Sequence, residues 1–316
     1  MIRELKSFIL AVESDLDSFS KNKTGLLAKL SSYAMTGSGK RVRPGLVYLS
    51  SRFGSADEAL VRETALAVEM IHIATLVHDD LVDDAFLRRQ KPTAAVRFGE
   101  GAAVLLGDYI YAEAFLRLSR SRSDLLRLFS ETTTTICAGE LAQYDSRYRF
   151  DLTEQDYLVF LEKKTASLMA ASCRAGGLLA SLPKDDLDAL DRFGHKAGVA
   201  FQIVDDVLDI EGDESSVGKT LLTDLTHGKM TLPLIDYAAT LTSDKERQEF
   251  QDILRHPDER VAPLVKAVRR SGVLTRSRKR ADALMAEALT SLQKLPAGGA
   301  RSLLEETAQR LVVRQS

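Results

Sequence analysis

The chain has 316 residues, 45% of them hydrophobic, which is enough for a large buried core. Its 43 Lys and Arg residues nearly balance 45 Asp and Glu residues, and the net charge of −2 gives no basic field for binding nucleic acid. Low contents of Gly (19) and Pro (7) favour long helices over a strand-and-turn architecture. The two cysteines, Cys137 and Cys173, are too few for a disulfide scaffold or a zinc module.

Apolar residues recur with the helical period along nearly the whole chain. The first helix carries one apolar stripe, formed by Leu5, Phe8, Ile9, Val12, Leu16 and Phe19. The spacing of Ser55 and Glu58 predicts a capping box before a long apolar helix over 59–87. Further helices are predicted over 44–53, 102–118, 123–147, 154–181, 186–211 and 231–242, with two or three more after Pro257 that end near Val313.

The absence of strand alternation predicts the all-α class, as one large helical bundle over residues 1–316. The N-terminal apolar stretch is interrupted by Glu4 and Lys6, so we expect no signal peptide. The longest apolar runs stop well short of the roughly 18 residues that a membrane span needs. We therefore expect a soluble, cytoplasmic protein.

An acidic cluster, Asp79-Asp80-Leu-Val-Asp83, ends the long predicted helix. Asp79 and Asp83 are four residues apart, so their carboxylates leave the same helix face and repel each other. A cation would neutralise this cluster. Oxygen ligands without His or Cys suit Mg²⁺, which prefers to share phosphate oxygens.

A second cluster, Asp205-Asp206-Val-Leu-Asp209, lies inside the apolar stretch 197–210. Its apolar flanks indicate that the helix is mostly buried, where unpaired carboxylates are very costly. Two facing aspartate clusters with Mg²⁺ between them would clamp a diphosphate and stabilise the charge that develops as a C–O bond breaks.

Cations that could bind phosphate stand in two polar, Gly-bearing segments, over 36–44 and 211–233, beyond the first acidic cluster, and before Thr165. In that order they are Lys40, Arg41 and Arg43, then Lys219 and Lys229, then Arg88 and Arg89, and last Lys163 and Lys164. His72 precedes Asp79 by seven residues, which places both close to one helix face. The glycine spacing around Lys40 and Lys219 does not match a nucleotide-binding P-loop, and neither lysine follows a predicted strand.

With these residues in place, the chain resembles the trans-isoprenyl diphosphate synthases, or polyprenyl synthetase family. The matching segments occur in the family's order over about residues 37–235. They are Gly39-Lys-Arg-Val-Arg-Pro44, Ile71-His72, His78-Asp-Asp-Leu-Val-Asp83, Leu87-Arg-Arg89, Lys91-Pro-Thr93, Gly107-Asp-Tyr109, Gly139-Glu140, Lys164-Thr-Ala166, Phe201-Gln-Ile-Val-Asp-Asp-Val-Leu-Asp209, Gly218-Lys219, Asp224-Leu225 and Gly228-Lys-Met-Thr-Leu-Pro233.

The resemblance implies an all-α bundle around a deep cavity, usually a homodimer, with three Mg²⁺ ions per active site. It assigns Asp79, Asp80 and Asp83, and from the opposite wall Asp205, Asp206 and Asp209, to Mg²⁺ on the allylic diphosphate. It assigns Arg88, Lys164, Thr165, Gln202 and Lys219, with Lys229, to the allylic diphosphate itself. It assigns Lys40, Arg43, His72 and Arg89 to a metal-free site for isopentenyl diphosphate.

The implied reaction ionises the allylic diphosphate, lets the double bond of isopentenyl diphosphate attack the cation, and passes a proton to the departing pyrophosphate. Apolar walls would keep water from the cation. The chain departs from the family pattern at Gln90, where Gly is usual, at Thr220, where Pro is common, and at Leu222, where Gly is frequent. These departures bear on loop dynamics more than on the chemistry.

Short-chain members resemble one another in carrying a bulky aromatic four or five residues before the first Asp. Here Thr75 and Ala74 occupy those positions, and Ile71 with Met70 lies one turn further. No aromatic side chain at these positions would block the growing product, so the resemblance implies a long, octaprenyl-like product. Phe115 or Phe129 could supply a floor from another helix. A long product is insoluble in water, so we also expect peripheral membrane contact at its release.

Four other interpretations stay open beside this one. A shorter-chain, geranylgeranyl synthase would keep the same sites. A non-catalytic subunit of a heteromeric synthase would have lost an acidic cluster, and both are intact. A class I terpene cyclase would not need the second site of Lys40, Arg43 and His72. A nucleic-acid module would use Arg269, Arg270 and 276–280, which at helical spacing spread over a solvated face.

Overall fold

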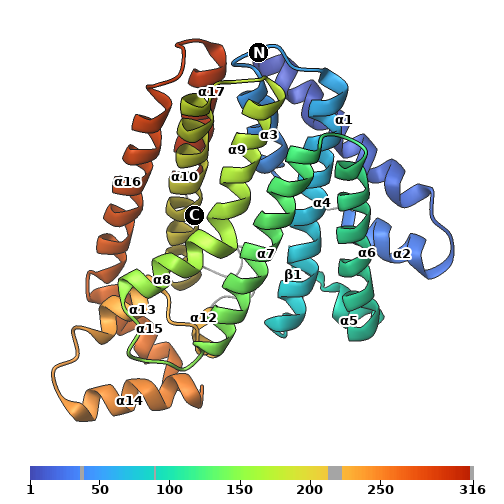
Figure 1. Ribbon diagram of the computed structural model, residues 1–316. Helices are drawn as coiled ribbons and strands as arrows, with labels where there is room; N and C mark the ends of the chain where they lie inside the picture. The colour runs from blue at the N-terminus through green and yellow to red at the C-terminus, as the bar shows by residue number, and fades with distance from the viewer. Residues whose placement is uncertain (36–38, 89, 213–222, 314–316) are drawn as a thin grey trace. The chain divides into compact units, whose positions relative to one another are not determined.

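Helices make up most of the computed structural model, as the ribbon in Figure 1 shows. The structure describes residues 1–35, 39–88, 90–212 and 223–313. It divides into two compact units: one holds Met1–Thr134, Leu168–Gly194 and Leu289–Thr307, and the other Thr135–Ser167, His195–Ala288 and Ala308–Ser316. The all-α prediction is confirmed, whereas the prediction of one domain over residues 1–316 stays a prediction.

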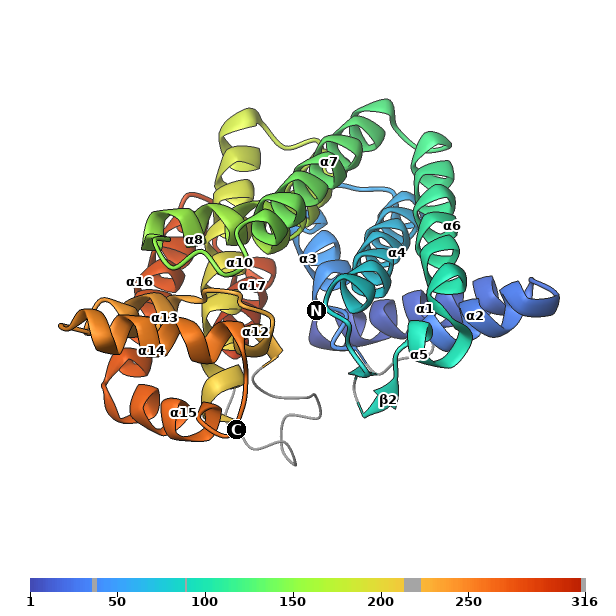
Figure 2. The same ribbon diagram turned by 90° about the horizontal axis from the view of Figure 1, so that it is seen from below.

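The first unit is built around α4 (Glu58–Val82). Side chains on several faces of α4 are buried, among them Val61, Leu66 and Ile71, as expected for a helix in the middle of a bundle. In both views α4 runs beside α6 (Glu100–Ser119) (Figures 1 and 2). The unit also contains α1 (Ile2–Lys21), α2 (Gly25–Met35), α3 (Val42–Ser51), α5 (Ala94–Phe98), the first half of α7 (Ser123–Asp145), most of α9 (Ser167–Leu179), the start of α10 (Lys184–Glu211) and the greater part of α17 (Gly299–Val312).

The start of α4 differs from the prediction. Asp57, and not Ser55, is the N-cap, because its carboxylate accepts hydrogen bonds from the backbone N–H groups of Ala59 at 2.8 Å and Leu60 at 3.2 Å. A charged acceptor also interacts favourably with the positive end of the helix dipole.

The end of α4 also differs from the prediction, which ran the helix on to residue 87. The helix stops at Val82, and Asp84 turns the chain with a φ of 44°. Leu87–Arg88 (β1) and Lys91–Pro92 (β2) then form a short antiparallel hairpin that pairs Arg88 with Lys91. Gln90 has a φ of 62°, in the left-handed region that glycine adopts most readily, which explains why Gly is usual at this position.

The hairpin is tied back to the acidic end of α4. The backbone N–H of Ala85 donates to the carbonyl of Asp80 at 2.9 Å, and the Thr93 hydroxyl donates to the carbonyl of Ala85 at 2.8 Å. Thr93 also caps α5, since its hydroxyl accepts from the N–H of Val96. This turn determines where the side chain of Arg88 can reach.

The second unit contains the rest of α7 and α10, together with α8 (Glu154–Leu161), α12 (Thr223–Thr226), α13 (Leu232–Ala238), α14 (Asp244–Arg255), α15 (Val261–Arg270) and most of α16 (Val273–Leu292). Helices α13, α14 and α15 lie together in both views (Figures 1 and 2). They pack on a core that includes Val207, Phe250, Leu254, Val268 and Val273. The sequence prediction missed α14, although Ser243 and Glu246 form a capping box at its start.

One turn of π-helix, Glu162–Ala166, interrupts the segment predicted as a single helix over 154–181. Such turns are rare and frequently lie at functional sites. Among the described residues, no helix combines the length and apolarity needed to cross a membrane.

Candidate active site

The predicted acidic cluster stands at the C-terminal end of α4. Asp79 and Asp80 belong to the last turn of the helix, and Asp83 follows as its C-cap, with its N–H donating to the carbonyl of Asp79 at 2.9 Å. Asp80 is 6% exposed, whereas Asp79 and Asp83 are half-buried. The negative end of the helix dipole lies here, so the three carboxylates add charge where it is least favourable.

Arg88 partly compensates this charge. Its Nε donates to Oδ1 of Asp80 at 2.7 Å, and its Nη2 lies 2.7 Å from the same oxygen. Burial nevertheless raises the pKa of Asp80 to about 6, because the desolvation of the carboxylate outweighs the opposing effect of Arg88. Asp79 and Asp83 contribute further repulsion.

A cavity of about 120 Å³ joins this end of α4 to other predicted residues of the first unit. His72, Asp80 and Arg88 all line it. The remaining lining residues come from α2, α3, α4, the hairpin and α5: Tyr33, Ala34, Arg41, Glu69, Ile73, Leu76, Val77, Lys91, Pro92, Thr93 and Ala94. The cavity thus brings together basic side chains and apolar walls, as a diphosphate with a hydrocarbon tail would require.

The polar segment before α3 carries Lys40 and Arg43. Lys40 is exposed, and Arg43 is half-buried with its Nε fully enclosed. Within the described part of the chain, that Nε has no hydrogen-bond partner. Desolvation lowers the pKa of Arg43, while Glu69 and Asp79 oppose the shift. An enclosed donor without an acceptor is what an anionic ligand would satisfy.

The second acidic cluster lies near the end of α10, in the second unit. Asp206 is 6% exposed, and both of its oxygens are hydrogen-bonded: the Tyr157 hydroxyl donates to Oδ2 at 2.7 Å, and Gln202 Nε2 donates to Oδ1 at 2.9 Å. The Thr165 hydroxyl in turn donates to Oε1 of Gln202 at 3.1 Å. These contacts link the predicted residues Thr165 and Gln202 to Asp206.

The surroundings of Asp206 raise its pKa to about 7. Desolvation is the main cause, Asp224 and Asp205 add repulsion, and the hydrogen bonds from Gln202 and Tyr157 act in the opposite direction. Asp209 is buried and Asp205 is half-buried. The cluster therefore holds several carboxylates in a poorly hydrated place, as the apolar sequence around it predicts.

Two predicted lysines of the second unit have acidic partners. Lys164, in the π-helical turn, forms an ion pair with Glu140 and donates to Oε1 of Gln143 at 3.3 Å. Lys229 is 8% exposed and lies 3.6 Å from Asp224. Both ammonium groups are thus held in place by side chains of the same unit.

The remaining predicted residues divide into two groups. Ala74 and Ile71 are fully buried on α4, and Thr75 is half-buried with its hydroxyl bonded to the carbonyl of His72 at 2.7 Å. Arg89 and Lys219 lie outside the described residues, as do Thr220 and Leu222.

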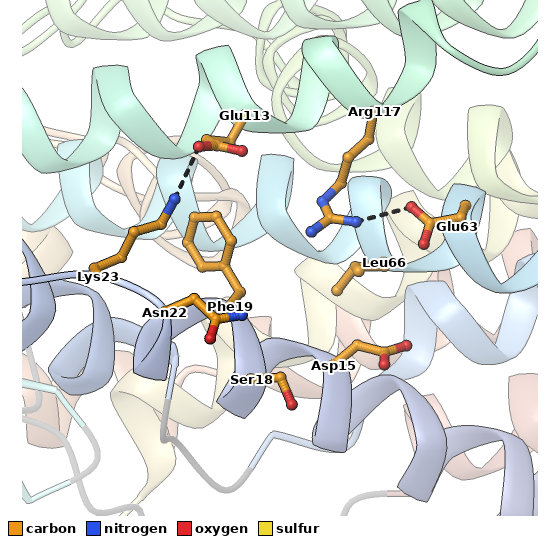
Figure 3. A pocket seen from close by; sticks show the side chains of 9 residues that line it. All are labelled: Asp15, Ser18, Phe19, Asn22, Lys23, Glu63, Leu66, Glu113 and Arg117. Carbon is orange, nitrogen blue, oxygen red and sulfur yellow. Dashed lines mark hydrogen bonds and ion pairs between the residues drawn. The ribbon is translucent and has the colours of Figure 1, made fainter.

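A second cavity, of about 240 Å³, lies elsewhere in the first unit (Figure 3). Residues of α1, α4, α6 and the link after α1 line it, and none of them is a predicted site residue. Figure 3 shows two ion pairs among its lining residues, Lys23 with Glu113 at 3.1 Å and Arg117 with Glu63 at 2.8 Å. The remaining charged residue, Asp15, pairs with Arg62 at 2.5 Å. The 120 Å³ cavity is therefore the better candidate for a substrate site.

Comparison with known proteins agrees with this geometry. The family model described as polyprenyl synthetase matches residues 24–270. The chain belongs to the polyprenyl synthetase family. It is accordingly a trans-prenyltransferase, a trans-polyprenyl diphosphate synthase, and the substrates of this family are isoprenyl diphosphates.

Relatives of the family differ in the products that they are named for. The chain is 35% identical over 306 residues to heptaprenyl diphosphate synthase component 2 of Geobacillus stearothermophilus, covering 96% of this chain and 95% of the relative. It is 36% identical over 275 residues to octaprenyl diphosphate synthase of Escherichia coli (strain K12), covering 86% and 84%. Other similar proteins are named geranylgeranyl diphosphate synthases.

Among solved structures, a polyprenyl synthase from Caulobacter crescentus CB15, described as complexed with calcium and isoprenyl diphosphate, superposes with a TM-score of 0.94. It is 30% identical, and the match covers 100% of this chain and 97% of that one. The helical isoprenoid synthase fold is thereby confirmed for this chain.

Several residues at the polyprenyl synthetase site were not singled out from the sequence. They are Tyr157, which bonds to Asp206, Glu69, which lines the 120 Å³ cavity, and Gln143, which bonds to Lys164. Glu140, which pairs with Lys164, and Asp224 were noted only as parts of motifs. Glu69 could have been found, because it stands one helical turn before His72.

The raised pKa of Asp206 predicts a pH-dependent stability of the metal-free protein. The folded state keeps a proton on Asp206 that the unfolded chain loses near pH 4, so this contribution is fully present below about pH 4 and is lost as the pH rises through about 7. In a chelator, Asp206→Asn should therefore gain stability relative to the wild type between about pH 4 and 7.

Denaturant titrations at a series of pH values measure this difference. Asp151→Asn is the control, because Asp151 is exposed and Arg149 lowers its pKa, so its difference from the wild type should not rise over the same range. A difference for Asp206→Asn that stays constant with pH would contradict the prediction.

Proposed function

We propose that this chain condenses isopentenyl diphosphate with farnesyl or geranylgeranyl diphosphate and makes a long, all-trans, octaprenyl-like product. The observation that carries the proposal is the composition of the 120 Å³ cavity, where an acidic helix end, Arg88 and His72 meet apolar walls. The partnerless Nε of Arg43, within the described residues, supports an anionic ligand close to this site.

The donor set fits Mg²⁺. Among the described residues, no three His, Cys, Asp or Glu side chains converge as a ready-made metal cage. Mg²⁺ does not need such a cage, because it is commonly held by one or two carboxylates, waters and substrate phosphates. We propose that Asp79, Asp80 and Asp83, and separately Asp205, Asp206 and Asp209, hold three ions on the allylic diphosphate. When bound, Mg²⁺ supplies positive charge to the departing pyrophosphate.

The chain's own residues bind and orient the two substrates. In the proposal, Arg88, Lys164, Thr165, Gln202 and Lys219, with Lys229, bind the allylic diphosphate, whose C–O bond breaks to leave an allylic cation. Lys40, Arg43, His72 and Arg89 hold isopentenyl diphosphate so that its double bond attacks this cation. The proton then lost passes to pyrophosphate, which needs no dedicated base, and the apolar walls exclude water.

We propose that the chain acts as a homodimer. Support comes from α6, where Val104, Leu105 and Leu116 are 44%, 69% and 45% exposed and fall on one side of the helix. Sedimentation equilibrium should give twice the chain mass of 34.8 kDa. A monomer would instead favour assembly with a different partner subunit, which the name of the component 2 relative suggests for that protein. If the monomeric chain were also inactive alone, the non-catalytic alternative would be favoured.

The experiment that tests the function is incubation with farnesyl diphosphate, labelled isopentenyl diphosphate and Mg²⁺, followed by chromatography of the dephosphorylated products. A ladder that ends at a long polyprenol is the expected result. A ladder that ends at geranylgeraniol would keep the reaction and support the shorter-chain alternative. No incorporation by a folded protein would contradict the proposal.

The small side chains on α4 predict that Ala74→Tyr shortens the product. Ala74 is fully buried, so the larger ring must occupy space on the side where we expect the growing chain to run. Thr75→Phe, at a half-buried position, is a second variant with less overpacking, and circular dichroism checks that both fold. An unchanged product distribution in two folded variants would show that the chain does not pass along α4.

A further inference from the structure

Arg41 and Glu69 form an ion pair deep inside the first unit. Their side chains are 5% and 4% exposed, and Nη1 of Arg41 donates to Oε1 of Glu69 at 2.7 Å. Nε of Arg41 also reaches Oε1 of Glu13, at 3.4 Å. A buried ion pair gains little net stability, because removing both charges from water offsets most of their attraction. The pair therefore calls for a role other than stability.

The position of Arg41 in the chain suggests that role. It lies between Lys40 and Arg43, the two cations proposed to bind isopentenyl diphosphate, and it is the N-cap residue of α3. Its φ of 46° and ψ of 44° are left-handed, a conformation that a residue with a long side chain seldom adopts unless its surroundings impose it. The ion pair with Glu69 is one of the contacts that hold the side chain of Arg41 while its backbone adopts this conformation.

The position of Glu69 points the same way. It stands on α4 one turn before His72, the third described residue of the proposed isopentenyl diphosphate site, and both line the 120 Å³ cavity. The pair thus joins the backbone that carries Lys40 and Arg43 to the helix that carries His72. Glu69 also neutralises Arg41, which stands between Lys40 and Arg43 in the chain. The charges of Lys40 and Arg43 are then left for a diphosphate.

We propose that Arg41 and Glu69 are positioning residues for the diphosphate of isopentenyl diphosphate. Both side chains line the 120 Å³ cavity, but each charge is paired with the other, so their role is to hold the segment of Lys40 and Arg43 in register with His72 and not to bind the diphosphate. This inference rests on the proposed function, since it assumes that these three residues form the isopentenyl diphosphate site.

The test replaces both charges at once. Arg41→Met with Glu69→Met removes the pair and leaves side chains of similar length, and such apolar replacements of buried ion pairs are often neutral or stabilising. We expect a folded enzyme whose KM for isopentenyl diphosphate rises at least about tenfold, because small displacements of binding groups are costly. The KM for the allylic diphosphate should change less than about twofold.

The pair of Lys23 and Glu113 provides a matched control in the same unit (Figure 3). It is less buried than the Arg41 and Glu69 pair, with side chains 20% and 23% exposed, and it lines the other cavity. Lys23→Met with Glu113→Met should leave both KM values unchanged. If the Arg41 and Glu69 double variant fails to fold, Arg41→Lys, which keeps the charge but loses the planar fork, should show the same selective rise.

Calorimetric binding of isopentenyl diphosphate separates this inference from the proposed function, because binding needs no turnover. Weaker binding by the double variant supports the positioning role whether or not the wild type forms products. Wild-type affinity in the folded double variant, or an equal rise in both KM values, would overturn the role. A wild type that binds isopentenyl diphosphate without making a product ladder would contradict the proposed function alone.

Discussion

Burying ionised carboxylates costs free energy, and this cost is the main physical constraint on the structure of this synthase. Asp80 and Asp206 lie almost fully buried on long, mainly apolar helices, and burial is the largest cause of the raised pKa of each. A protein selected for stability alone would place apolar residues there. The clusters are intelligible if a cationic ligand offsets their repulsion when the substrate is bound.

Neighbouring side chains reduce the free-energy cost of burying these carboxylates by donating hydrogen bonds to them. The hairpin after α4 returns Arg88 to Asp80, and Thr93 fixes the turn that makes this return possible. In the second unit, Tyr157 and Gln202 each donate to one oxygen of Asp206. Arg88 and Gln202 are also among the residues that we propose to bind the allylic diphosphate, so the side chains that contact the buried carboxylates here are the same ones proposed to bind substrate.

The sequence predicted those features of the fold and of the candidate site that depend on the spacing of residues only a few positions apart. The 3.6-residue period predicted the helices, and carboxylates four residues apart predicted the acidic sites. The start of α4 was predicted to within one residue, but its cap was wrong, because Asp57 competes with Ser55. The C-terminal end was also wrong, because a hairpin closed by contacts of Thr93 leaves no periodic signal. The π-helical turn at Lys164 was not predictable for a similar reason, since the same residues also fit an ordinary helix.

Partners distant in the chain were beyond the reach of sequence patterns. Tyr157 is 49 residues from Asp206 and Glu69 is 28 from Arg41, and nothing in the local sequence of either pair reveals the contact. The resemblance to the family supplied the residues that we propose to meet substrate, whereas the structure added side chains that contact them.

The central claim is that a divalent cation with a diphosphate neutralises the carboxylates of the two acidic clusters. The most direct measurement is the thermal unfolding midpoint with a chelator and then with Mg²⁺ and inorganic pyrophosphate, for the wild type, Asp79→Asn and Asp205→Asn. Ligands that bind the folded state raise its stability, so we predict a clear rise for the wild type and a much smaller one for each variant. No rise for the wild type, or an equal rise in all three proteins, would contradict this account.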